Sequence, residues 1–122
     1  VDGQDYWIWE KLEYKPKIME IEFNPQLSLE ENKVMHYDPN HWTWRDTKCG
    51  YTGASMGALI KLGKIKGYSC VFRTQRNLIF VQKEYIDINL PIKELYDLYE
   101  EGKEENNRIE ILHKNPQWVI IE

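Results

Sequence analysis

The stretch "SMGALIKLGKIKGYSCVFRTQRNLIFVQ" (residues 55–82) carries most of the information about the fold. Its first part places apolar and small residues at helical spacing, at Met56, Leu59, Ile60 and Gly63. Ser55 precedes this run as a suitable N-cap, and Gly67 follows it as a suitable terminator. The strand-like runs "YSCVFR" and "LIFVQ" come next, joined only by residues 74–77, which favours an antiparallel hairpin. The stretch therefore predicts a helix followed by a hairpin.

The segment "YTGASMG" (residues 51–57) leads into this helix and admits three interpretations: a phosphate-binding loop, a helix cap, or part of another ligand site. It follows no obvious strand and lacks the lysine of a phosphate-binding loop. The architectural interpretation is favoured, in which Gly53 and Ala54 let the chain pass close to a neighbour and Ser55 caps the helix.

Upstream, the pattern predicts a short helix over residues 5–13, with Asp5 in its first turn. Residues 17–23 then alternate, with Met19, Ile21 and Phe23 on one side, as in a strand that Asn24-Pro25 ends. Residues 26–50 show no sustained period and are interpreted as a long, functional loop.

Downstream, residues 89–102 predict a helix, with Pro91 in its first turn and Gly102 at its end. The tail "RIEILHKNPQWVIIE" (residues 108–122) predicts two short strands about a turn at residues 114–116.

Composition limits the class of protein. With 122 residues, of which 42% are hydrophobic, the chain has enough apolar surface for one core, and a single domain over residues 1–122 is expected. The net charge of -4, without a basic cluster, argues against nucleic acid and anionic membranes as partners. We expect a soluble, cytoplasmic protein, since no apolar run reaches the length of a membrane span and no signal peptide is evident. Cys49 and Cys70 are too few for a disulfide framework and are expected to be reduced thiols.

Several short motifs occur in a fixed order: "VDGQDYW", "PKIMEIEFNP", "YDP" and "YTGASMGALIKLGKIKGY". In this order they resemble the C-terminal half of FkbM-like and related uncharacterised S-adenosylmethionine-dependent methyltransferase-like proteins. The resemblance covers residues 1–85, and residues 86–122 would be a C-terminal helix and hairpin extension. The chain departs from the family pattern at Thr52, where an aromatic residue is frequent, and at Glu20, inside an otherwise apolar strand.

The resemblance implies an α/β fold, a three-layer Rossmann-like half-sheet with a C-terminal antiparallel hairpin. Strands 17–23, 68–73 and 78–82 would form one mixed sheet, and the unpaired edge of such a half-sheet predicts a homodimer. The family uses S-adenosylmethionine, held mainly by a glycine-rich turn and an acidic residue of the first two strands. Neither feature precedes Val1, so this chain alone is expected to bind no cofactor.

Two functions follow as expectations. The first is a methyltransferase-like domain, incomplete as given, that acts on a saccharide or another small molecule. The alternative is a catalytically silent binding or oligomerisation domain with the same half-fold. A longer gene product with a glycine-rich turn upstream would favour the enzyme.

Candidate catalytic carboxylates are Asp2 and Glu22, because ligands in open α/β sheets bind beyond the carboxyl ends of strands. Either carboxylate could accept a proton from a hydroxyl group of the acceptor or form a hydrogen bond to a ligand. Asn24 is a candidate for substrate binding at the same edge. The structural alternative is that these residues only build turns and caps.

A second group of candidates crowds the long loop. His36 could act as a base near neutral pH, while Tyr37, Asp38 and Trp42 could bind a flat or sugar-like substrate. Ser55 is a further candidate for substrate binding. The structural alternative is a loop that its tryptophans attach to the core. No metal site is expected, because His36, His41 and Cys49 lack a nearby fourth ligand.

Overall fold

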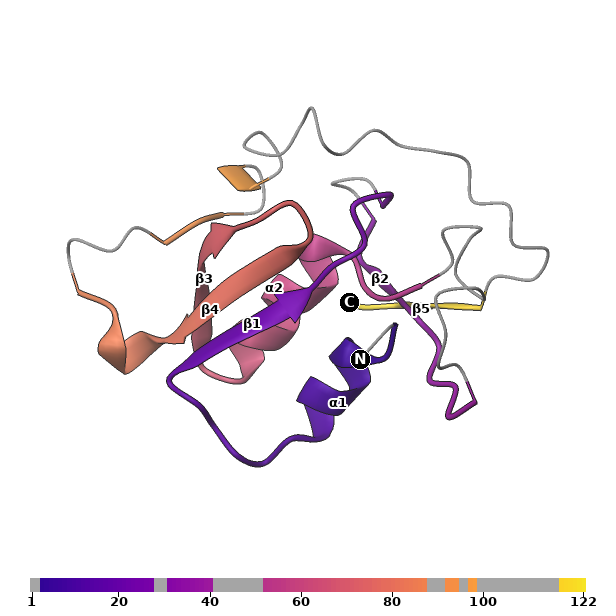
Figure 1. The fold of residues 1–122 in the computed structure, drawn as a ribbon, viewed down its shortest axis with the longest axis horizontal. Coiled ribbons are helices and arrows are strands. Elements are labelled where there is room, and N and C mark those ends of the chain that lie inside the picture. The colour runs from indigo at the N-terminus through magenta and orange to yellow at the C-terminus, as the bar shows by residue number, and fades with distance from the viewer. Residues whose placement is uncertain (1–2, 28–30, 41–51, 88–91, 95–96, 99–116) are drawn as a thin grey trace.

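The computed structural model describes residues 3–27, 31–40, 52–87, 92–94, 97–98 and 117–122 (Figure 1). The elements, in chain order, are α1 (Asp5–Lys11), β1 (Ile18–Glu22), β2 (Lys33–Met35), α2 (Met56–Ile65), β3 (Tyr68–Arg73), β4 (Asn77–Gln82), the 3-10 helix η2 (Lys83–Tyr85) and β5 (Trp118–Ile120). The described part of the chain is thus a mixed α/β structure with antiparallel sheets.

The helix and hairpin predicted from residues 55–82 are confirmed. Ser55 is the N-cap of α2, and its side chain accepts a hydrogen bond from the backbone N–H of Ala58. Gly67 follows the helix with a φ of +87°, a left-handed conformation that glycine adopts without steric cost. Strands β3 and β4 pair antiparallel, with a register shift between Cys70 and Phe72.

The three predicted strands form one sheet in the order β1-β4-β3 (Figure 1). The prediction that this sheet is mixed is wrong for these strands, because both neighbouring pairs are antiparallel. The physical reason is the position of β4, which returns from the hairpin into the space beside β1. Strands β1 and β3 therefore run in the same direction but are separated by β4 and never pair.

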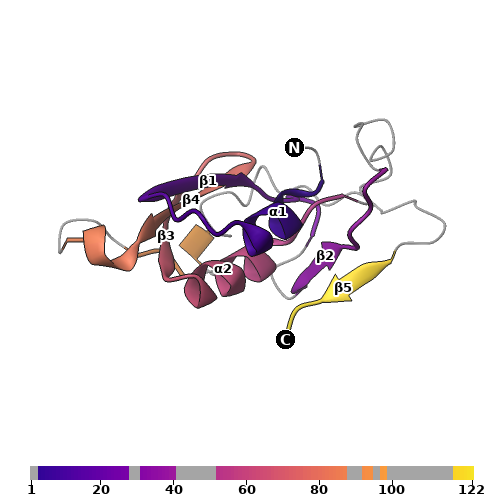
Figure 2. The same ribbon diagram turned by 90° about the horizontal axis from the view of Figure 1, so that it is seen from below.

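Helices α1 and α2 lie on the same side of this sheet (Figure 2). The ring of Trp9 in α1 lies 4.9 Å from that of Phe80 and 5.6 Å from that of Tyr68, centroid to centroid. A Cβ atom on Gly63 of α2 would lie only 2.7 Å from the Phe80 ring. The described elements thus make two layers, and they do not include the second helical layer that a three-layer Rossmann-like fold requires.

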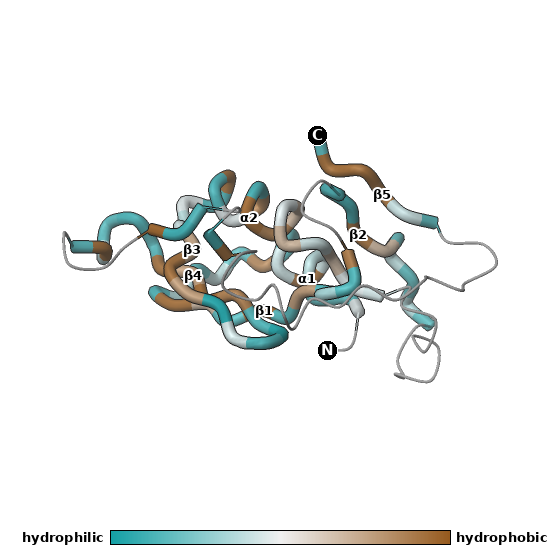
Figure 3. The backbone as a smooth tube through the Cα atoms, turned by 90° about the horizontal axis from the view of Figure 1, so that it is seen from above, coloured by the Kyte–Doolittle hydropathy of each residue, from teal (hydrophilic) through white to brown (hydrophobic). Residues whose placement is uncertain are grey.

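A second sheet joins β2 to β5, far away in the sequence. Strand β2 lies within the segment that was predicted to be a loop. The prediction missed this strand because three residues are too few for an alternating pattern. Val34, at its centre, is fully buried and also bridges Ala54 on its other side. Strand β5 is largely hydrophobic (Figure 3) and covers the outer edge of β2.

Most of the predicted C-terminal region lies outside the described residues, including the first strand of the tail hairpin and most of the helix over residues 89–102. Of the described parts, residues 92–94 are not helical, whereas residues 97–98 are. Leu98 belongs to the same cluster of buried side chains as Tyr6, Phe23 and Phe80.

Candidate functional site

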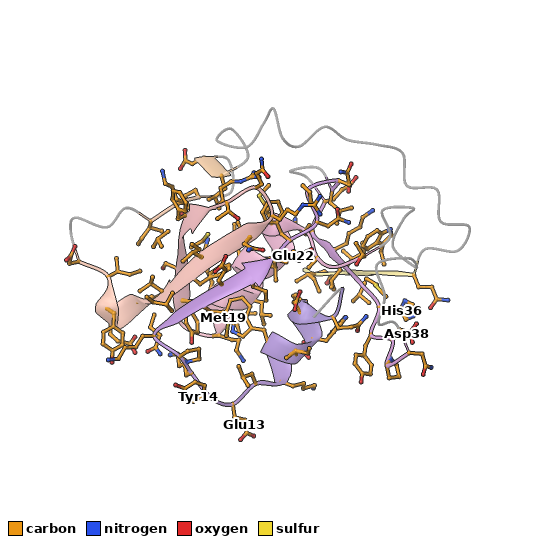
Figure 4. All side chains as sticks on the ribbon, viewed as in Figure 1. Glu13, Tyr14, Met19, Glu22, His36 and Asp38 are labelled. Carbon is orange, nitrogen blue, oxygen red and sulfur yellow. The ribbon has the colours of Figure 1, made fainter. Side chains whose placement is uncertain are left out.

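The candidate residues from the sequence lie in two separate places. Glu22 is the last residue of β1. His36 and Asp38 follow β2 and lie to the right of α1 in Figure 4, away from Glu22. Glu22 and His36, two of the three predicted catalytic residues, therefore do not face a common site. Asp2 and Trp42 lie outside the described residues.

At the end of β1, Asn24 is buried and used by the fold. Its Oδ1 accepts a hydrogen bond from the backbone N–H of Gln26 at 2.9 Å, which closes a turn. Its Nδ2 donates to the carbonyl oxygen of Thr52, also at 2.9 Å, and its backbone N–H donates to that of Ala54. Asn24 thus joins the end of β1 to the segment that enters α2.

Ser55 has a similar double role. Its Oγ accepts hydrogen bonds from the backbone N–H groups of Ala58 and Lys33, both at 3.1 Å. Its side chain is buried and connects α2 to β2. The adjacent Gly53 has a φ of +62°, and a Cβ atom there would meet nothing within 4 Å. The chain does pass close to β2 here, as expected, because the backbone N–H of Met35 donates to the carbonyl oxygen of Gly53 at 2.8 Å. Glycine is needed at this position for the backbone conformation and not for space.

Glu22 has an exposed side chain on the face of the sheet opposite the helices, paired in register with Asn77. On the same face, Oε1 of Glu20 accepts a hydrogen bond from Nδ2 of Asn77 at 2.7 Å. This contact accounts for an acidic residue inside β1. Glu22 is thus placed at a strand end as expected, on an open surface.

The segment of His36, Tyr37 and Asp38 is held at both ends by hydrogen bonds. The backbone N–H of His36 donates to the carbonyl oxygen of Gln117 at 3.0 Å. The backbone N–H of Asp38 donates to Oε1 of Gln4 at 3.3 Å, near the start of α1. Tyr37 lies between them with its side chain 60% exposed.

An open pocket of 720 Å³ lies between α1 and this segment, a volume typical of small-molecule sites. It is lined by Trp7, Ile8, Glu10, Lys11, Leu12 and Tyr37. Nε1 of Trp7 donates to the carbonyl oxygen of Met35 at 2.7 Å, which fixes the indole ring. Of the lining residues, only Tyr37 was a sequence candidate.

The missed residues of α1 did leave a signal in the sequence. The run "DYWIWEKL" has apolar residues on more than one face of the helix, and only Tyr6 and Trp9 are buried in the core. Trp7, Ile8 and Leu12 therefore form a second apolar face. Such a face on a short surface helix indicates a binding surface or a further packing contact.

Among the described residues, no group of three or more His, Cys, Asp or Glu side chains is placed to hold a metal ion. No helix in the described ranges is long and apolar enough to cross a membrane. Comparison of the chain with protein-family models, with curated proteins and with solved structures gives no match.

Proposed function

We propose that the chain is part of a methyltransferase-like domain that acts on a saccharide or another small molecule. One observation carries the proposal: β1 and β3 run in the same direction, α2 lies between them in the sequence, and β4 returns between them in the sheet. A helical crossover between strands of the same direction is the unit from which α/β sheets are built. The hairpin of β3 and β4 corresponds to the antiparallel hairpin that the resemblance implies.

The start of the described chain gives further support. Gly3 has a φ of +81°, as a turn between a strand and α1 would require. The order of this turn, α1 and β1 agrees with the order of the motifs that carry the resemblance. Glu22 at the carboxyl end of β1 would then serve as the proton acceptor for a hydroxyl group of the substrate.

The described residues do not by themselves fit S-adenosylmethionine. Asn24, Ser55 and Arg73, polar side chains near the carboxyl end of β1, bind backbone groups of the fold instead. The few contacts that remain would not offset the roughly 4–15 kcal/mol cost of immobilising a ligand. Calorimetry of this chain alone is expected to show no saturable binding, and micromolar binding would mean that the cofactor site has been misplaced.

The decisive experiment uses the full-length product of the gene. It should bind S-adenosylmethionine in calorimetry, and Asp2→Ala and Glu22→Ala should each lower its turnover more than Trp42→Ala, because these carboxylates would lie nearer the reacting atoms. No cofactor binding by the full-length product would overturn the proposal.

A catalytically silent binding domain is the second candidate, and the pocket beside α1 favours it. The pocket is lined by residues of α1 and by Tyr37 rather than by residues at the end of β1. This second function would be supported if the full-length product bound a ligand in this pocket but did not bind S-adenosylmethionine.

A further inference from the structure

We propose that the pocket between α1 and Tyr37 binds a neutral ligand that carries a planar aromatic ring. The inference does not depend on methyl transfer, because the pocket is built from residues other than those at the end of β1. Ring binding and cofactor binding can therefore succeed or fail separately.

The lining of the pocket suits a flat apolar ligand. Trp7 and Tyr37 supply two aromatic surfaces, and Ile8 and Leu12 supply aliphatic surface that is 46% and 36% exposed. Aromatic rings gain both area burial and favourable ring geometry from such neighbours. A sugar would need several hydrogen-bonding partners. Among the described lining residues, the polar side-chain groups are those of Glu10 and Lys11, the Tyr37 hydroxyl and the bonded indole N–H of Trp7.

The walls are held in place without a ligand. The indole N–H of Trp7 is bonded to Met35, and its ring packs edge-on against Tyr6 at 5.0 Å between centroids. Hydrogen bonds from Asp38 to Gln4 and from His36 to Gln117 fix the backbone on either side of Tyr37. Since the Trp7 ring and the backbone around Tyr37 are already held, less conformational entropy is lost on ligand binding than at a flexible site.

The charges of the pocket favour a neutral ligand. Nζ of Lys11 lies 3.6 Å from Oε1 of Glu10, so the two charges of the lining offset one another. Both groups are exposed, and their field is screened by water and salt. A charged ligand would gain little from this site over its own hydration.

Indole is the probe for the test, followed by nitrogen-proton correlation NMR of the intact chain. Saturable shifts are expected at the amides of residues 7–12 and 36–38 and at the indole N–H of Trp7. Tyr37→Ala should weaken binding about tenfold, because one aromatic surface is lost. Tyr14→Ala is the matched control: Tyr14 is 74% exposed and lies on the loop after α1, away from Asp38 (Figure 4), and should leave the affinity unchanged.

Three results would overturn the proposal. The first is the absence of saturable shifts at millimolar indole while the spectrum remains that of a folded protein. The second is an equal loss of affinity in the Tyr14 and Tyr37 variants. The third is tighter binding of glucose than of indole.

Discussion

Gly63 is a position of close contact between α2 and the sheet. A Cβ atom there would lie 2.7 and 2.9 Å from two carbons of the Phe80 ring and 3.3 Å from the ring of Trp9. We expect Gly63→Ala to lower the free energy of unfolding by about 1–3 kcal/mol through overpacking, although alanine favours a helix by about 1 kcal/mol. Urea denaturation measures the change. Ile65→Ala, at a position 81% exposed on the same helix, is the control, and its free energy of unfolding should stay within about 0.5 kcal/mol of the parent's. The prediction would be contradicted if Gly63→Ala lowered the free energy of unfolding no more than Ile65→Ala does.

Tyr68 makes the stability of the chain sensitive to alkaline pH. Burial raises the pKa of its phenol, with smaller contributions from Glu84 and Tyr14, while a hydrogen bond with Gln82 lowers it. The hydroxyl donates to the carbonyl oxygen of Pro16. Because the folded state holds the proton more tightly, its stabilisation is complete below about pH 10 and is lost as pH rises further.

The test compares the parent with Tyr68→Phe in urea denaturation from neutral pH to about pH 11. The variant should be less stable by about 0.5–1.5 kcal/mol at neutral pH, since a hydrogen bond is lost. It should also lose less stability at alkaline pH. Burial likewise raises the pKa of Tyr6, so some pH dependence should remain in the variant. Parallel stability curves for the two proteins would contradict this account.

At the scale of elements, Ser55 couples α2 to β2. One hydroxyl oxygen caps the helix and also accepts the backbone N–H of Lys33. We expect Ser55→Ala to cost about 2–3 kcal/mol, because the loss of a cap adds to the loss of a second buried partner. Hydrogen exchange should then accelerate at Lys33 as well as in the first turn of α2. Acceleration confined to α2 would show that β2 does not depend on this contact.

Prediction from the sequence succeeded where the signal was local. The helix with its cap and the hairpin after Gly67 follow from spacing within 28 residues, and alternation around Ile21 located β1. Strand β2 was missed, because three residues are too few for an alternating pattern and its partners at Ala54 and Val119 are distant in sequence. The antiparallel pairing of β3 with β4 was predicted correctly, but the prediction of a mixed sheet was wrong, since periodicity does not encode which strand returns beside β1.

The site shows the same division. Aromatic crowding in the sequence indicated Tyr37, which does line the pocket. Trp7 was missed, because a tryptophan on a short helix is ordinarily a core residue. Its ring is held at the pocket by a hydrogen bond to the carbonyl oxygen of Met35, which the sequence does not reveal. Asn24 and Ser55 were named as substrate-binding residues, but short polar side chains near turns are equally suited to backbone groups, and that is how the fold uses them.

At the scale of the whole molecule, the sheet has an edge at β1. Among the described residues, β4 is the only strand paired with β1. The carbonyl oxygen of Lys17 and the N–H of Phe23 form hydrogen bonds on the β4 side of β1. Backbone groups of successive residues in a strand point alternately to its two sides, so those of Glu20, three positions from each, point away from β4. Open edges pair with other chains, and we expect a homodimer that forms through β1.

Sedimentation equilibrium tests this association. Glu20→Pro removes an outward N–H and should weaken the dimer, whereas Glu20→Ala, which loses the same contact with Asn77, should not. A parent protein that stays monomeric at all concentrations would rule the dimer out.

The pairing of β2 with β5 has a consequence for synthesis on the ribosome. Met35 pairs with Trp118, which is 83 positions later in the chain. At roughly 5–20 residues per second, β2 waits about 4–17 s after it is made before β5 exists. The side chains of Val34 and Met35, almost inaccessible in the finished fold, lack this strand neighbour during that interval. A nascent chain paused before residue 118 would therefore present β2 to chaperones, and release from them would follow the arrival of β5.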